Sequence, residues 1–95
     1  MINLYQKTWK EINTELAERM VRLRKRKKLS QKNLAMRSDV SLGSLKRFEQ
    51  TGEISLQSLT KIAITLGVEG ELEDLFRKVP FNSIEEVIHA QTKQD

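Results

Sequence analysis

Apolar side chains recur along much of the chain at intervals of three and four residues, the spacing that places them on one face of an α-helix. We expect the first helix to start at Thr8, because TWKE matches the Ser/Thr-x-x-Glu capping box, and Asn13 or Thr14 are later alternatives. The apolar face of this helix is predicted to consist of Ile12, Leu16, Met20 and Leu23.

Three serines stand directly before further helical patterns. Ser30, Ser41 and Ser55 are each expected to cap a helix, because a hydroxyl at this position accepts a hydrogen bond from a backbone N–H of the first turn. Gly52 and Gly67 should end the last two of these helices. The three inner faces are predicted to hold Leu34 and Ala35, then Leu45 and Phe48, then Leu56, Leu59, Ile62, Ala63 and Leu66.

Two shorter helices are predicted towards the C-terminus. The first covers residues 71–77 and begins with acids that suit the helix dipole. Pro80 interrupts the path, and Ser83 begins another capping box for a brief helix, IEEVIHA. The side of the 71–77 helix that should face the core carries Leu72, Leu75 and Phe76.

These patterns predict an all-α fold. No alternation of apolar and polar residues lasts long enough to build a sheet. We expect one domain over residues 1–80, with its core at about residues 16–76, and a short C-terminal extension over residues 81–95 that carries the extra helix.

Residues 31–50 contain the parts of a helix-turn-helix, which reads DNA with the outer face of its second helix. Ala35 is the small residue where the two helices touch. Asp39 and Val40 form the corner, since Asp tolerates the left-handed conformation that a tight corner requires. The outer face of the second helix is predicted to present Leu42, Gly43, Ser44, Lys46 and Arg47.

The chemistry of this outer face suits base edges. Arg47 can donate two parallel hydrogen bonds to guanine O6 and N7, and Leu42 offers an apolar contact to a thymine methyl group. Gly43 has no side chain and would allow close approach of the backbone. Because polar readers are few, part of the specificity would come from DNA shape.

Charge is distributed unevenly along the chain. Residues 1–68 hold 14 Lys and Arg against 6 Asp and Glu, whereas residues 69–95 hold 3 against 7. A basic body attracts phosphate groups, and an acidic tail should lie away from them. The basic residues are densest between residues 19 and 28, where they serve phosphate contact or, alternatively, form a solvated helix end: Arg19, Arg22, Arg24, Lys25, Arg26, Lys27 and Lys28.

Several function classes are disfavoured by composition. The chain has no cysteine and only one histidine, His89, so it lacks the residues of a disulfide, a thiolate metal site or a histidine cluster. It offers no convincing nucleophile and base, and we expect neither catalytic activity nor a cofactor. Neither a membrane-spanning run nor a signal peptide is recognised, so a cytoplasmic protein without a membrane partner is expected.

The chain resembles the phage-repressor-like, or Xre/Cro, family over roughly residues 16–76. The resemblance is carried by LSQKNLA, by the corner, by LKRFEQTG and by SLQSLTKIAITLGV. It implies a five-helix DNA-binding domain with a helix-turn-helix. Two positions depart from the family pattern, since Asp39 stands where Gly is typical and Ser38 occupies a position that is usually apolar.

The resemblance also implies roles for single residues. Gln31 would contact phosphate and a base, Ser41 and Ser44 would hold phosphates, and Arg24 and Glu49 fall where many members have a buried ion pair. Together with the basic run, the expected DNA-binding residues are Arg26, Lys27, Lys28, Gln31, Lys32, Ser41, Leu42, Gly43, Ser44, Lys46 and Arg47.

The leading hypothesis is a sequence-specific transcriptional regulator that acts as a repressor, binding double-stranded DNA with a palindromic operator as a homodimer. The alternative is an antitoxin-like protein that binds DNA and sequesters a toxin-like partner, such as a Hip-type kinase, as small family members with an extra C-terminal segment often do. A purely structural interaction domain is a further possibility. The segment that would dock on a dimer mate or a toxin carries Phe81, Ile84, Val87 and Ile88.

Overall fold

The computed structural model describes residues 6–78. These residues form five α-helices and no β-strand, which confirms the all-α prediction. The extra helix predicted after Pro80 and the proposed tail residues lie outside the described residues. The helices are α1 (Trp9–Arg26), α2 (Gln31–Ser38), α3 (Leu42–Thr51), α4 (Leu56–Leu66) and α5 (Glu69–Asp74).

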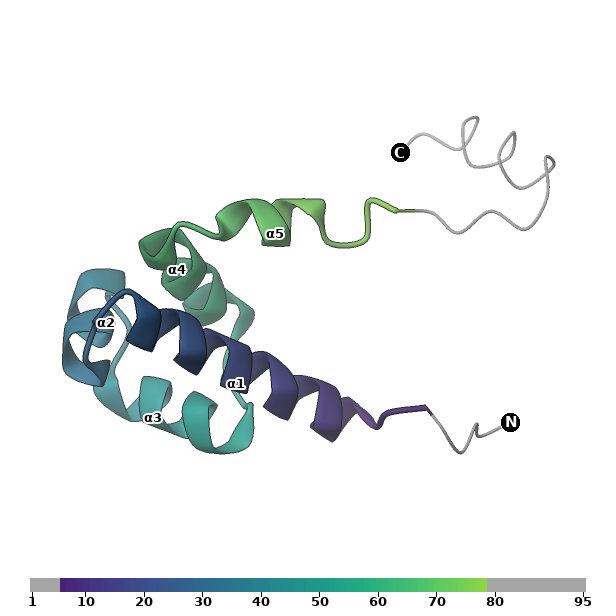
Figure 1. Ribbon diagram of the computed structural model, residues 1–95, viewed down its shortest axis with the longest axis horizontal. Helices are drawn as coiled ribbons and strands as arrows, with labels where there is room; N and C mark the ends of the chain where they lie inside the picture. The colour runs from purple at the N-terminus through teal and green to yellow at the C-terminus, as the bar shows by residue number, and fades with distance from the viewer. Residues whose placement is uncertain (1–5, 79–95) are drawn as a thin grey trace, which may run out of the picture.

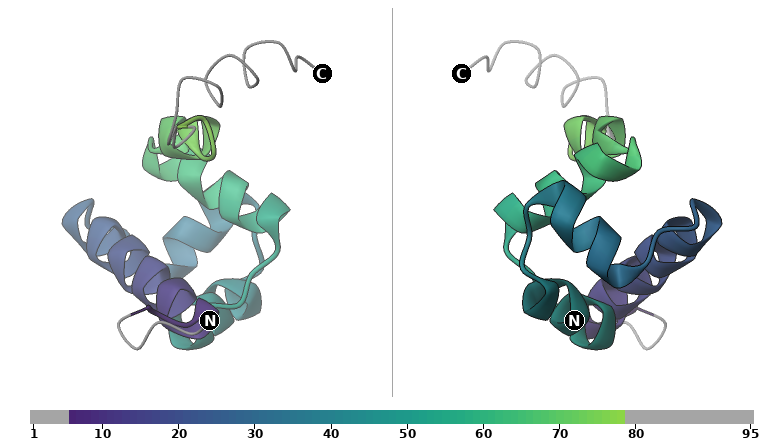
Figure 2. Two further views of the ribbon diagram at one scale, coloured as in Figure 1. Left: turned by 90° about the vertical axis from the view of Figure 1, so that its right-hand side faces the viewer. Right: turned by 90° about the vertical axis from the view of Figure 1, so that its left-hand side faces the viewer.

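The helices are arranged so that α3 and α5 lie at opposite ends of the described part (Figures 1 and 2). The long helix α1 packs against α3, the short helix α2 packs against both α3 and α4, and α4 also contacts α5. The C-terminal half of α1 is therefore covered by other helices, whereas its first turns project past them (Figure 1). None of the five described helices is long and apolar enough to cross a membrane.

Side-chain caps determine where four of the helices begin. Thr8, Ser30, Ser41 and Ser55 each accept a hydrogen bond from the backbone N–H three residues later, at distances of 3.0 to 3.1 Å. The predicted start of α1 at Thr8 is thus confirmed. Each cap satisfies one of the N–H groups that a helix start leaves without an intrahelical partner.

The core lies where α1, α2, α3 and α4 meet. Most of the inner-face predictions for α2, α3 and α4 are confirmed, since Leu34, Ala35, Leu45 and Phe48 and most of the α4 stripe are buried. Burying one large apolar side chain contributes about 1.5–3 kcal/mol. The largest side chains that are fully buried are Phe48, Leu34, Leu45, Ile62 and Leu66.

The predicted apolar face of α1 is wrong in part. Ile12 and Leu16 are exposed, and the buried face runs through Ala17, Met20 and Arg24 instead. Both stripes share Met20, so the helix is rotated about its axis relative to the prediction. The packing of α3 against α1 determines which face of α1 is buried. The spacing of apolar residues within α1 cannot predict this, because it depends on another helix.

Two further predictions need correction near the C-terminal end. Leu56 is exposed, because it is the first residue of α4 and precedes the part that packs on the core. The fifth helix covers Glu69–Asp74 and not residues 71–77. Leu75 is extended and Phe76 is left-handed with φ 69°, so both apolar side chains lie beyond the helix and are exposed.

Candidate nucleic-acid interface

The corner between α2 and α3 is short and is closed by a backbone hydrogen bond. Asp39 adopts the left-handed conformation with φ 57°, and the N–H of Val40 reaches back to the carbonyl of Ala35 at 3.0 Å. Ser38 is buried, and its hydroxyl donates to the carbonyl of Leu34 at 2.6 Å. Both departures from the family pattern are therefore accommodated, because Asp39 takes up the required conformation and the polar group of Ser38 is satisfied.

The helix that follows this corner has one buried and one exposed face. Leu45 and Phe48 are fully buried against the core, so α3 cannot rotate without exposing them. Leu42 is half-buried and packs against the core cluster, so only part of its side chain faces solvent. The residues on the outer face are exposed, as a groove-reading helix requires: Gly43, Ser44, Lys46 and Arg47.

The structure brings Arg24 and Glu49 together in a buried ion pair. Arg24 Nε lies 2.9 Å from Glu49 Oε2 and Arg24 Nη2 lies 3.0 Å from Glu49 Oε1, and the two side chains are 9% and 8% exposed. Arg24 Nη1 also donates to the carbonyl of Leu29 at 2.9 Å. This one guanidinium group therefore joins the end of α1, the following loop and α3.

Gln31, the first residue of α2, lies beside the same pair. Its side-chain amide donates to Glu49 Oε1 at 2.9 Å. An amide nitrogen carries two hydrogens and the amide oxygen can accept, and within residues 6–78 only one of these hydrogens is used. Glu49 thus holds the side chain of Gln31 in a fixed position next to α3.

Arg47 is held by the turn that follows α3. Its Nη2 donates to Glu53 Oε2 at 2.6 Å, with both side chains exposed. The hydroxyl of Thr51 donates to the carbonyl of Arg47 at 2.7 Å and accepts from the N–H of Glu53 at 3.1 Å. Sequence reasoning missed Glu53, because it lies outside the helix and no helical spacing links it to Arg47.

The start of α3 presents two exposed hydroxyl groups. Ser41 accepts from the N–H of Ser44 at 3.1 Å and donates to the hydroxyl of Ser44 at 2.7 Å. A helix start carries partial positive charge and exposes N–H groups, both of which attract phosphate. A shallow hollow continues from here between α3 and the start of α4, and its lining includes Ser44, Arg47, Ser55 and Ser58.

A family model described as helix-turn-helix matches residues 20–72, which reach from the second half of α1 into α5. The chain belongs to the phage-repressor-like helix-turn-helix family. Members of this family are DNA-binding transcriptional regulators, and in this helix-turn-helix protein α2 is the first helix of the motif and α3 the second. Comparisons with curated proteins and with solved structures give no significant match.

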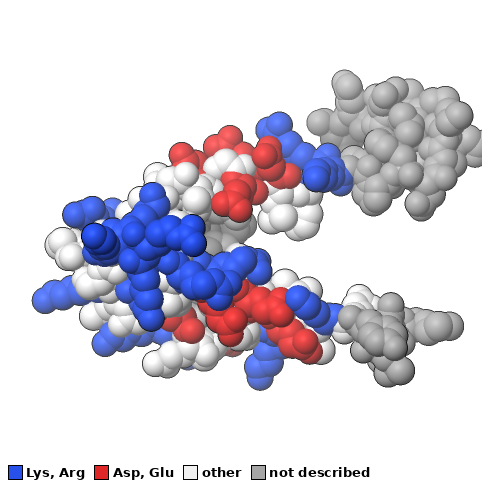
Figure 3. Space-filling model, viewed as in Figure 1, with Lys and Arg blue, Asp and Glu red and all other residues white. Residues whose placement is uncertain are grey.

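The basic residues of this helix-turn-helix protein gather at the end of α1 and over α2 (Figure 3). Acidic side chains lie instead over the first half of α1 and along α5. The acidic side chains of α5 belong to the segment predicted to be acidic, whereas those on the first half of α1 lie within residues 1–68, the segment predicted to be basic. Within the basic region the candidate residues Arg26, Lys27, Lys28 and Lys32 are all exposed.

Among residues 6–78, no group of three His, Asp or Glu side chains is placed to hold a metal ion. The candidate interface residues themselves offer hydrogen-bond donors and fixed positive charge. Such groups bind phosphate oxygens and the acceptor atoms of base edges.

Proposed function

We propose that this regulator is a repressor that reads a palindromic operator as a homodimer, with α3 in the major groove. The observation that carries the proposal is the division of α3 into two faces. Leu45 and Phe48 fix the helix from behind, while Gly43, Ser44 and Arg47 remain exposed in front. A helix supported in this way can enter a major groove without rearrangement of the core.

Each exposed group has a proposed partner on DNA. Arg47 donates to guanine O6 and N7, Leu42 contacts a thymine methyl group through its exposed part, and Gly43 allows the backbone close to the bases. The hydroxyl groups of Ser41 and Ser44 bind phosphate at the start of α3.

Further contacts to the phosphate backbone come from α2 and from the basic region. Gln31 is positioned by Glu49 and has a second amide hydrogen available to phosphate. Lys46, which is exposed on α3, contacts a further phosphate group. The end of α1 and the start of α2 contribute Arg26, Lys27, Lys28 and Lys32, whose charges add affinity for any DNA sequence.

The proposed homodimer is supported by the small number of base contacts that a single copy of α3 can make. One helix-turn-helix offers few base contacts, and two copies place their half-sites about 34 Å apart on DNA. A repressor acts by occupying such a site.

Selection of bound DNA from a random pool tests the proposal. We expect a consensus with two-fold symmetry for the wild-type chain. Arg47→Ala should lose preference at one base pair in each half-site, where a bidentate contact is worth about 1–3 kcal/mol. Lys10→Ala, at the far end of α1, is the matched control and should select the wild-type consensus. If the wild-type chain enriches no sequence, or if Arg47→Ala selects an unchanged consensus, α3 does not read DNA as proposed.

A further inference from the structure

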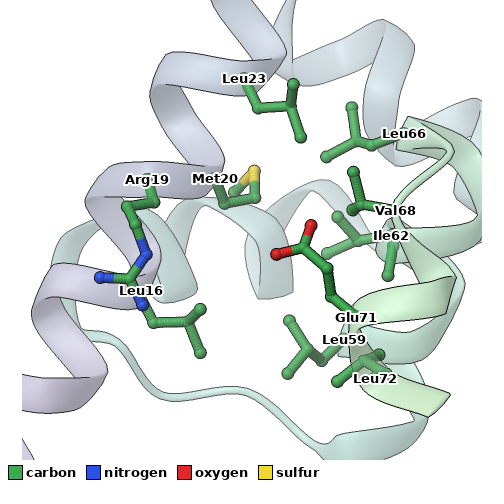
Figure 4. Close-up of a pocket in the computed structure, with 11 residues that line it drawn as sticks. Leu16, Arg19, Met20, Leu23, Leu59, Ile62, Leu66, Val68, Glu71 and Leu72 are labelled. Atoms are coloured by element: carbon green, nitrogen blue, oxygen red, sulfur yellow. The ribbon is translucent and has the colours of Figure 1, made fainter. Parts of the chain in front are cut away.

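An apolar groove lies between α1, α4 and α5 (Figure 4). Its volume is 190 Å³, and an engineered cavity of about 150 Å³ with a similar lining binds benzene. The groove therefore has room for one aromatic ring. The apolar residues that form its sides include Leu16 and Met20 from α1, Leu59 and Ile62 from α4, Leu72 from α5 and Val68, which directly precedes α5.

Two charged residues also line this groove. Figure 4 shows the carboxylate of Glu71 pointing from α5 into the groove, with Arg19 on the side formed by α1. Within the described residues, no basic side chain forms an ion pair with Glu71. A carboxylate beside an apolar surface favours an occupant that combines an apolar group with a positive charge.

The chain itself displays such a combination directly after α5. Phe76 is 90% exposed, and Arg77, the next residue, also has an exposed side chain. Arg77 Nε donates to the carbonyl of Glu73 at 3.0 Å and lies 3.9 Å from Asp74 Oδ1, which leaves the two Nη groups directed to neither. The backbone of Phe76 is left-handed with φ 69°, which is unfavourable for a bulky residue. Strained backbone conformations are typical of functional segments. Here the strained residue presents an aromatic ring to solvent beyond the end of α5.

We propose that a second copy of this chain occupies the groove. Phe76 of each protomer inserts between α1, α4 and α5 of the other, and Arg77 faces the partner's Glu71. The exchange is reciprocal because α5 forms one side of the groove and Phe76 follows α5 by two residues, so one two-fold axis beside α5 can place Phe76 of each copy in the groove of the other. This interface rests on the proposed function, of which it specifies the homodimer, and it leaves α3 exposed at the other end of each copy (Figure 1).

Sedimentation equilibrium of the full chain without DNA tests the interface. Phe76→Asn should raise the dimer dissociation constant by roughly a hundredfold or more, because two aromatic side chains per dimer are no longer buried. Asn tolerates the left-handed conformation, so the fold of each protomer should be retained, as circular dichroism will check. The matched control is Ile64→Gln, which removes an exposed apolar side chain outside the groove and should leave dissociation unchanged.

A charge exchange tests the pairing of Arg77 with Glu71. Arg77→Glu and Glu71→Arg should each weaken the dimer about tenfold, and the double variant should recover the wild-type dissociation constant. A mixture of the two single variants should dimerise more tightly than either variant alone, because only the mixed dimer then pairs opposite charges across the interface.

Three results would overturn the proposal. The wild-type chain could stay monomeric at about 1 mM, or Phe76→Asn could dimerise as tightly as the wild type. Alternatively, Ile84→Asn rather than Phe76→Asn could weaken the dimer, which would assign the groove to the C-terminal segment. A wild-type monomer would also remove the homodimer from the proposed function, whereas the other two results concern this interface alone. None of the three affects the base preference set by Arg47, so a failure of this interface is distinct from a failure of α3 to read DNA.

Discussion

Arg24 and Glu49 share two hydrogen bonds of 2.9 and 3.0 Å in the interior of the domain, and this pair fixes the helix proposed to read DNA. Because the same guanidinium group also binds the carbonyl of Leu29, the pair joins α3 to both the end of α1 and the loop after it. The position of the proposed DNA-reading face therefore depends on residues that do not themselves face solvent.

Arg24→Met should destabilise the domain by about 3–5 kcal/mol, because it leaves the carboxylate of Glu49 buried without its partner. Urea denaturation measures this change. The double variant Arg24→Met with Glu49→Leu should be less destabilised than the single variant, since neither charge is then buried. A single-variant loss below about 1 kcal/mol would show that the pair is solvated like a surface ion pair.

Glu53→Gln should raise the affinity for the selected operator several-fold. Glu53 binds Arg47 in the free protein, so the guanine edge must compete with this carboxylate for the guanidinium group. Fluorescence anisotropy with the operator duplex gives the dissociation constant. The free energy of unfolding should change by less than about 1 kcal/mol, because both side chains are exposed. Unchanged DNA affinity would place Glu53 away from the interface.

Gly52→Ala should cost more stability than Gly67→Ala. Both glycines are left-handed, with φ 80° and 74°, so each substitution carries about 1–2 kcal/mol of backbone strain. A Cβ at Gly52 would additionally lie 2.9 Å from the backbone carbonyl carbon of Asn13, whereas nothing lies within 4 Å of a Cβ at Gly67. Thermal unfolding measures the stability lost by each variant, and the difference between the two losses gives the cost of the clash at Gly52. Equal losses would mean that the backbone near Asn13 moves to make room for the Cβ.

Removal of charge at Lys27 and Lys28 should weaken binding to all DNA sequences equally. The double variant Lys27→Ala with Lys28→Asn should keep the local backbone conformation. Lys28 is left-handed with φ 58°, and Asn tolerates this conformation. The slope of log affinity against log salt should fall by about one unit for each phosphate group that the variant no longer neutralises. Lys10→Ala should leave the slope unchanged. An unaltered slope in the double variant would place both lysines in solvent.

The sequence predicts the local features of this fold well. Thr8, Ser30, Ser41 and Ser55 act as caps where the sequence places them, because a cap depends on a residue and the backbone three positions later. The left-handed corner at Asp39 was predictable for the same reason. The order and type of the helices follow from these signals.

Features that depend on distant parts of the chain were not predictable. Ile12 and Leu16 continue a regular apolar stripe, yet α3 covers a different face of α1. Leu75 and Phe76 continue the spacing of α5, but the helix ends before them. The contact of Arg47 with Glu53 is invisible to sequence patterns, because it arises from a turn that Thr51 and Gly52 shape.

The projection of α1 past the rest of the bundle has a kinetic consequence. Trp9 and Ile12 are exposed, whereas Met20 and Arg24 are packed into the interior. Amide protons in the first turns should therefore exchange with deuterium through local fraying, while those near Arg24 should exchange only when the whole domain opens. A single continuous helix thus spans the full range of protection, from nearly that of a free peptide at one end to that of global unfolding at the other.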